Sequence, residues 1–338
     1  NGVKVLIKNN YVLGEKRSLH LPGAHLEFEV LTEKDELDIN EFAVKNGVDM
    51  VAISLVRTAE HIQSVRDRLR SDPRGEKIKI IAKIENLEGL RNYEEILALA
   101  DGVMIMRQQL SLELSMEKVF IAQKWMIQQA NLAAKPVICA TQIFESMVEN
   151  SQPTDQEASD VSTCIFDGAD AILLNEETSI GEHPVDSVTL LSKICAEAER
   201  CIDYKATFLD LKKMSPNSVS PAEGLAAQTV KTSQNLSVDL IVVQTQNGML
   251  PKYVAKYRPS VGILACSENP AVLKALSSTR GVLKLVLTKD AGEALIVQAL
   301  RYAKENNLCK PGRKVLFLHG MMDDQVDEFP MKEIIDVE

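Results

Sequence analysis

Short apolar runs alternate with longer amphipathic stretches along most of the chain. The apolar runs, rich in Val, Ile, Leu and Ala, predict buried strands over residues 50–55, 78–84, 102–106, 136–140 and 171–174. The stretches between them predict helices over residues 59–70, 93–99, 116–130 and 155–166. Alternating strands and helices are typical of βα units around a parallel sheet, whose strands are apolar throughout because both faces are covered. The pattern therefore predicts an α/β fold.

Polar residues follow each predicted strand at its carboxyl end. They are Ser54 and Arg57, Lys83 and Glu85, Arg107 and Gln109, Thr141 and Gln142, and residues 175–178. In a (β/α)8 barrel, catalytic groups come from the carboxyl ends of several strands. No G-x-G-x-x-G follows a strand, which argues against a dinucleotide-binding sheet. The sequence therefore predicts a TIM-type barrel, to which this chain contributes five strands.

A second, smaller α/β domain is predicted after a change of composition near residues 201–221, where prolines and serines gather. Beyond this segment the alternation resumes with a helix over residues 222–234. Further strands are predicted over residues 240–243, 261–265 and 314–318. The chain has no internal repeat of fixed period and no low-complexity tract.

Composition excludes several classes of protein. The 338 residues carry a formal net charge of -10, which argues against a nucleic-acid partner. The six cysteines are scattered without a C-x-x-C pair, so we expect a reduced, cytoplasmic protein without disulfides or a zinc site. No apolar run approaches the roughly 18 residues of a membrane span, and no signal peptide opens the chain. Because the chain begins with Asn1 in a β-rich segment, we expect a preceding portion.

Several segments together resemble the pyruvate kinase family. They are residues 31–39 with 47–57, then 80–86, 136–147, 152–161, 167–174 and 253–259, in the family's order. The resemblance implies an eight-stranded barrel with a lid domain inserted after the third strand, and a C-terminal α/β domain. It assigns residues 1–20 to the last strand and return of the lid, 21–205 to barrel strands four to eight, and 206–338 to the C-terminal domain. The first three strands, with the ligands of the monovalent ion, are absent from this chain.

The resemblance also implies a glycolytic reaction, phosphoryl transfer from phosphoenolpyruvate to ADP, with Mg²⁺ (or Mn²⁺) and K⁺ as cofactors. Lys83 matches the lysine beside the transferring phosphoryl group, and Glu85 matches a ligand of the divalent metal. Thr141 matches the threonine beside the enolate carbon. Without the resemblance, Lys83 and Glu85 would fit an ordinary exposed ion pair, and Thr141 a helix N-cap. The family also implies a homo- or hetero-oligomer, a tetramer in its usual form.

The sequence departs from the family at the end of the third predicted strand. Where the family has A-R-G-D-L-G, this chain has Met106 followed by Arg107, Gln108, Gln109, Leu110 and Ser111. Arg107 is matched, and by resemblance it lies in the substrate-binding segment with Gln108 and Gln109. Gln109 stands where the family has its second metal-binding carboxylate, and Gln108 adds a side chain where a glycine lets backbone approach the substrate. These changes predict a weakened metal site.

Further departures raise an alternative function. Glu176 fills a glycine position, and Gln152 and Asp155 replace two arginines of the family pattern. The effector loop of regulated members is represented by Thr245, Asn247 and Gly248, but lacks two of its three hydroxyls, so we expect no sugar-phosphate effector. Two hypotheses remain: a pyruvate kinase of weakened activity, or an inactive paralogue with a structural or regulatory role in an assembly. Different enolate chemistry on the same barrel is a third, weaker option.

Overall fold

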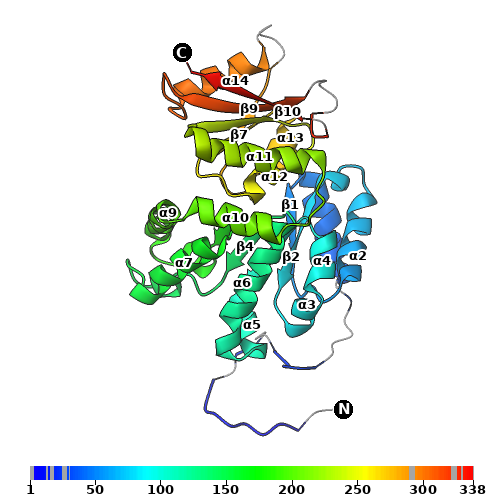
Figure 1. The fold of residues 1–338 in the computed structure, drawn as a ribbon. Helices are drawn as coiled ribbons and strands as arrows, with labels where there is room; N and C mark the ends of the chain where they lie inside the picture. Colours follow the sequence, from blue (N-terminus) through cyan, green and yellow to red (C-terminus); the bar gives the residue numbers. More distant parts are fainter. Residues whose placement is uncertain are drawn as a thin grey trace.

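The computed structural model describes residues 4–12, 14–15, 19–24, 29, 31–288, 294–320, 326–328 and 330–337. Within these residues the chain forms two layered α/β units, one from the blue-to-green half of the sequence and one from the yellow-to-red half (Figure 1). Each unit is built on a five-stranded sheet. The α/β fold expected from the alternating pattern is confirmed.

The first sheet is parallel, with its strands in the order of the sequence. The strands are β1 (Met50–Ile53), β2 (Lys79–Ile84), β3 (Gly102–Met106), β4 (Val137–Ala140) and β5 (Ala171–Leu173). All five residues of β3 are buried, as expected for a central strand covered on both faces. Because neighbouring strands are parallel, their carboxyl ends lie along one edge of the sheet.

Helices connect these strands and bury one face against them. They are α1 (Glu33–Leu37), η1 (Asp38–Val44), α2 (Ala59–Arg70), η2 (Gly75–Lys77), α3 (Leu87–Arg91), α4 (Tyr93–Leu99), α5 (Arg107–Glu113), α6 (Met116–Leu132), η3 (Glu145–Val148), α7 (Asp155–Asp167), α8 (Glu176–Ser179) and α9 (Pro184–Arg200). Local sequence explains the ends of α7. Thr154 and Glu157 form a capping box at its start, and Gly168 ends it with a left-handed backbone (φ 102°).

The second sheet has the order β10-β9-β6-β7-β8, and β10 is antiparallel to β9. Its strands are β6 (Leu240–Gln244), β7 (Gly262–Ser267), β8 (Val282–Val286), β9 (Lys314–Gly320) and β10 (Pro330–Asp336). The accompanying helices are α10 (Tyr204–Met214), α11 (Pro221–Leu236), α12 (Met249–Lys256), α13 (Pro270–Ala275) and α14 (Leu295–Glu305). Arg258 joins the two units, since its guanidinium lies 2.8 Å from a carboxylate oxygen of Asp170 at the start of β5.

The structure adds detail to several predictions from the sequence. Arg107 and Gln109 follow β3 as expected, and they lie on a helix, α5, that begins directly at Arg107. Residues 201–221 were interpreted as a change of composition, and they contain the whole of the eleven-residue helix α10. Residues 4–12, 14–15 and 19–20, the part of the range 1–20 that the structure describes, contain no strand, and the assignment of this range to the lid remains a prediction. Periodicity could not show any of these points, because each depends on packing.

All six cysteines are free. None of the helices that the structure describes is long and apolar enough to cross a membrane.

Candidate active site

The carboxyl edge of the first sheet brings together the charged residues that follow β1 and β2. Lys83 and Glu85 form an ion pair, with 2.9 Å between Nζ and a carboxylate oxygen. Lys83 Nζ also donates to Ser54 Oγ at 2.7 Å. The other oxygen of Glu85 accepts the backbone N–H of Leu55 at 3.1 Å, and Glu85 is only 8% exposed. The pair is thus a partly enclosed group held by the neighbouring strand, and the interpretation as an ordinary exposed ion pair is wrong.

Lys83 and Glu85 line a cavity of about 1240 Å³. Arg57 and Gln109, from the ends of β1 and β3, also line it. The cavity gathers charged groups from adjacent strand ends, both basic (Lys83, Arg57) and acidic (Glu85), as expected of an active site at the carboxyl edge of a barrel sheet.

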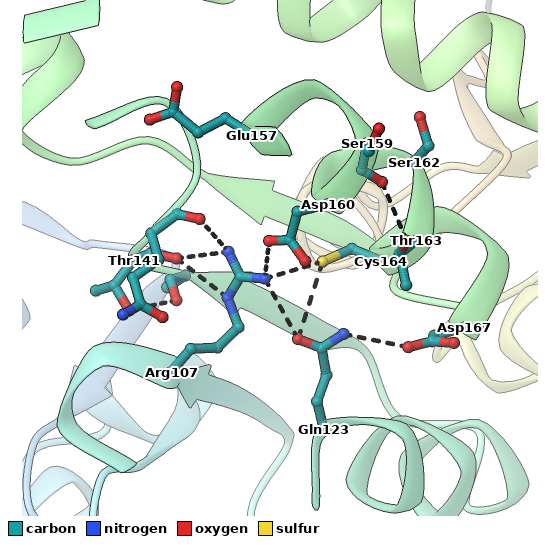
Figure 2. A network of polar contacts seen from close by, with 12 residues as sticks. Arg107, Gln123, Thr141, Glu157, Ser159, Asp160, Ser162, Thr163, Cys164 and Asp167 are labelled. Atoms are coloured by element: carbon teal, nitrogen blue, oxygen red, sulfur yellow. Dashed lines mark hydrogen bonds and ion pairs between the residues drawn. The ribbon is translucent and has the colours of Figure 1, made fainter. Parts of the chain in front are cut away.

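The end of β3 is fixed by Arg107, whose side chain is buried (Figure 2). Its guanidinium donates to the backbone carbonyl of Thr141 at 3.1 and 2.8 Å, from Nε and one terminal nitrogen. It also donates to the carbonyl of Gln142 and forms an ion pair with Asp160 of α7. Arg107 was expected among the substrate-binding residues, and the structure places its guanidinium on the loop that follows β4.

Thr141 and Gln142 have left-handed backbones, with φ of 65° and 52°. Non-glycine residues adopt this conformation only where their surroundings hold it, and such positions gather at functional sites. Thr141 Oγ1 donates to the carbonyl of Ala140 at 2.6 Å and accepts the N–H of Gln108 at 3.0 Å. Thr141 is therefore no helix N-cap, and its hydroxyl joins the ends of β3 and β4.

The environment of Arg107 shifts the pKa values of its neighbours. Burial alone would lower the pKa of Arg107, but Cys164 and Asp160 raise it above its usual value. Cys164 Sγ lies 3.6 Å from the guanidinium, and its pKa is lowered by a hydrogen bond with Cys139 and by Arg107. The pKa of Cys139 is raised by the same hydrogen bond and by burial. The guanidinium therefore stays charged throughout the physiological range.

Oxygen atoms that could hold a divalent metal are few. The amide oxygen of Gln109 is buried with no hydrogen-bond partner, and Gln109 lines the same cavity as Glu85. Among the described residues, no three His, Cys, Asp or Glu side chains gather in a way that could hold a metal ion. Mg²⁺ is commonly held by one or two protein oxygens with substrate oxygens and water. Glu85 and Gln109 fit that requirement with a single charge.

Three other residues of the site had no role assigned from the sequence. Ser54 accepts from Lys83, Asp160 pairs with Arg107, and buried Glu177 accepts the N–H groups of Phe144 at 3.2 Å and Asn175 at 2.7 Å. Ser54 was named as a strand-end residue without a role. Asp160 lies within the motif segment 152–161, and Glu177 lies among the strand-end residues 175–178. The sequence signal for both was a charged residue beside a strand end.

The predicted effector loop lies in the other unit, between β6 and α12. Thr245 is buried, and its hydroxyl donates to Asp327 at 2.6 Å. Asn247 donates its N–H to the same carboxylate at 3.0 Å, and Gly248 has a left-handed backbone with φ of 83°. Asp327 was not predicted, because it lies about 80 residues further along the chain.

The sequence of this chain was compared with family models and with known proteins. Residues 1–188 match the family model "Pyruvate kinase, barrel domain", and residues 223–331 match "Pyruvate kinase, alpha/beta domain". The pyruvate kinase of Dictyostelium discoideum is 41% identical over 94% of this chain, which covers 63% of that relative. The cytosolic isozyme of Glycine max is 37% identical, again over 94% of this chain and 66% of the relative.

The solved structures that this chain resembles are also pyruvate kinases. A crystal structure of a pyruvate kinase from Cryptosporidium parvum matches with a TM-score of 0.90 and 36% identity, over 94% of this chain and 64% of that one. The Cryptosporidium parvum enzyme in complex with ADP matches with a TM-score of 0.90 and 35% identity, over 98% and 67%. The chain thus spans about three fifths to two thirds of the length of these relatives. Sequence, sheet order and strand-end residues together show that this chain belongs to the pyruvate kinase family.

Proposed function

We propose that this protein transfers a phosphoryl group from phosphoenolpyruvate to ADP, with a rate limited by its altered metal site. The observation that carries the proposal is the pair Lys83 and Glu85. The two side chains lie 2.9 Å apart, Lys83 contacts Ser54 just after β1, and both residues line a cavity of about 1240 Å³. The pyruvate kinase relatives support the reaction, and the ADP complex of one of them supports the nucleotide. The cytosolic relatives support a cytoplasmic location.

The reaction assigns a role to each residue. The bond between the phosphorus and the enol oxygen breaks, a new bond forms to a terminal oxygen of ADP, and the enolate takes a proton at carbon to give pyruvate. Lys83 places a positive charge beside the phosphoryl oxygens, where negative charge accumulates. Thr141 offers the hydroxyl nearest the enolate by resemblance; because it donates to the carbonyl of Ala140, it must turn to deliver a proton.

Glu85 and Gln109 would hold the divalent metal, with substrate oxygens completing its ligands. When bound, Mg²⁺ neutralises charge on the phosphoryl oxygens. Glu85 is shared between this role and its ion pair with Lys83, and Gln109 contributes a neutral oxygen. We therefore infer that the metal binds less tightly than at a site with two carboxylates.

The test is pyruvate formation by the purified full-length protein with phosphoenolpyruvate, ADP and Mg²⁺ or Mn²⁺. We expect slow turnover in the wild type and a loss of roughly 100-fold or more in Lys83→Met, because one transition-state cation is removed. Lys45→Met is the matched control, since Lys45 is exposed at the end of η1 and forms an ion pair with Glu41. The double variant Gln108→Gly with Gln109→Asp should raise kcat/KM by roughly tenfold or more.

The absence of pyruvate from both the wild type and the double variant would overturn the proposal. It would favour the second candidate, an inactive relative that works in an assembly. One observation favours that candidate independently. Met116, Phe120 and Ile121 of α6 are 86%, 60% and 56% exposed, an apolar surface that a partner subunit would cover. Light scattering of the purified protein would show whether it assembles alone, and co-purification would identify a different partner.

A further inference from the structure

The loop between β6 and α12 surrounds a carboxylate of its own chain. Asp327, on the short segment between β9 and β10, is buried against residues 245–250. Its two oxygens accept four hydrogen bonds: from Thr245 Oγ1 at 2.6 Å and from the N–H groups of Gln246, Asn247 and Leu250 at 2.8, 3.0 and 3.2 Å. Consecutive N–H groups that converge on one point form a nest for an anion, and here the anion is a side chain.

The other N–H groups of the loop are satisfied locally. Gly248 donates to Thr245 Oγ1 at 2.8 Å, and Met249 donates to the side-chain oxygen of Asn247 at 2.8 Å. The next residue, Pro251, has no N–H to offer. Every backbone donor from Gln246 to Leu250 therefore has a partner, and an external anion would have to displace Asp327 to bind there.

Displacement is unfavourable for two reasons. Asp327 is held beside the loop by strands β9 and β6, which are hydrogen-bonded neighbours, so its effective concentration is high without any ligand in solution. Removing it would also leave buried N–H groups and a buried hydroxyl to be satisfied again. A phosphate group would present the same charged oxygens to the same donors, so the carboxylate and a phosphate compete for one site.

We propose that Asp327 is a built-in anionic ligand of the loop, which holds the C-terminal unit in one conformation and closes this site to phosphate-bearing effectors. The loop is then an anion site that is permanently filled from within. This regulatory property is independent of whether the strand-end cavity of the first unit catalyses phosphoryl transfer.

The test uses the full chain and inorganic phosphate as the probe, with potassium chloride at matched ionic strength as the control. Asp327→Ala empties the nest, and Glu328→Ala is the matched control, because Glu328 is the exposed neighbouring carboxylate. We expect Asp327→Ala to unfold at a temperature lower by roughly 5 °C or more, since four hydrogen bonds to a charged group are lost. Inorganic phosphate should then restore part of that loss in a saturable way.

Wild type and Glu328→Ala should respond to phosphate no more than to chloride. Saturable stabilisation of the wild type by phosphate would overturn the proposal, as would an Asp327→Ala variant that is as stable as the wild type or that phosphate does not rescue. If the Asp327→Ala variant fails to fold, amide hydrogen exchange of the wild type tests the proposal instead. The amides of Gln246, Asn247 and Leu250 should be protected without phosphate, and protection that appears only when phosphate is added would contradict the proposal.

Discussion

Two loops of this molecule are fixed by one buried charge each, of opposite sign. In the first unit, the guanidinium of Arg107 holds the carbonyl groups of Thr141 and Gln142 after β4. In the second unit, the carboxylate of Asp327 holds N–H groups of the loop after β6. A cation can only donate and a carboxylate can only accept, so the two charges leave different backbone groups available.

This difference separates an open site from a closed one. Arg107 occupies carbonyl oxygens, which an anionic substrate does not need, and the cations Lys83 and Arg57 still line the cavity. Asp327 occupies the N–H groups that an anionic ligand would need. A buried charge opposite in sign to the ligand therefore leaves free the backbone groups that the ligand would use. A buried charge of the same sign as the ligand occupies those groups and blocks the site.

The largest expected effect comes from removing the cation. Arg107→Leu leaves Asp160 without its partner, and the carbonyl groups of Thr141 and Gln142 without their buried donor. We expect a loss of about 3–5 kcal/mol in the free energy of unfolding, because two carbonyl groups lose hydrogen bonds to a charged donor, each worth roughly 1.5–3 kcal/mol. Urea denaturation measures it.

Asp160→Asn is the control for this change. Its side chain is 40% exposed, so water replaces much of the lost interaction, and we expect a loss of about 1 kcal/mol or less. An Arg107→Leu variant as stable as Asp160→Asn would show that the guanidinium does not fix the loop, and the comparison with Asp327 would fail.

The sequence predicts contacts between residues that are close along the chain, but not contacts between residues that are far apart along it. Strand β3 and helix α2 were predicted with the bounds that the structure has, because their apolar spacing is local. Lys83 and Glu85 could be placed at one strand end because they are two residues apart. Their roles, with those of the other site residues, remain predictions.

The partners that fix the loops could not be predicted. Arg107 and Asp160 are 53 residues apart, and Thr245 and Asp327 are 82 apart, so neither pair has a local pattern. The left-handed backbones of Thr141 and Gln142 also escape a sequence reading, because neither residue is glycine. Such contacts depend on how the sheet brings distant segments together.

An intermediate effect on stability is expected from removing the hydroxyl of Thr245, in the loop between β6 and α12. Thr245→Val keeps the shape of the buried side chain, removes one donor to Asp327, and leaves the N–H of Gly248 without its acceptor. We expect a loss of about 1–3 kcal/mol in the free energy of unfolding, measured by urea denaturation. Thr163→Val, at an exposed position of α7, should change stability by less than about 0.5 kcal/mol. Equal effects of the two variants would mean that the carboxylate does not need the hydroxyl.

The smallest effect is expected for Asp101 of the first unit. Like Asp327, this carboxylate accepts a backbone N–H, but it is less enclosed. Asp101 accepts the N–H of Ile80 at 2.9 Å and pairs with Arg66 at 2.9 Å, with its side chain 22% exposed. Burial would raise the pKa of Asp101, but the N–H of Ile80 and the charges of Arg66 and Lys79 together lower it below its usual value of 3.8.

A lowered pKa means that the folded protein favours the charged carboxylate. The stabilisation by Asp101 is therefore complete above the usual value of 3.8, and is lost as the pH falls through the lower pKa of the folded state. We expect Asp101→Asn to lower the free energy of unfolding by about 1 kcal/mol at neutral pH, after allowance for solvent screening, and by less as the pH falls below that value. Urea denaturation across pH measures the difference. A difference that stays constant with pH would show that Asp101 acts through its shape and not its charge, unlike the carboxylate of Asp327.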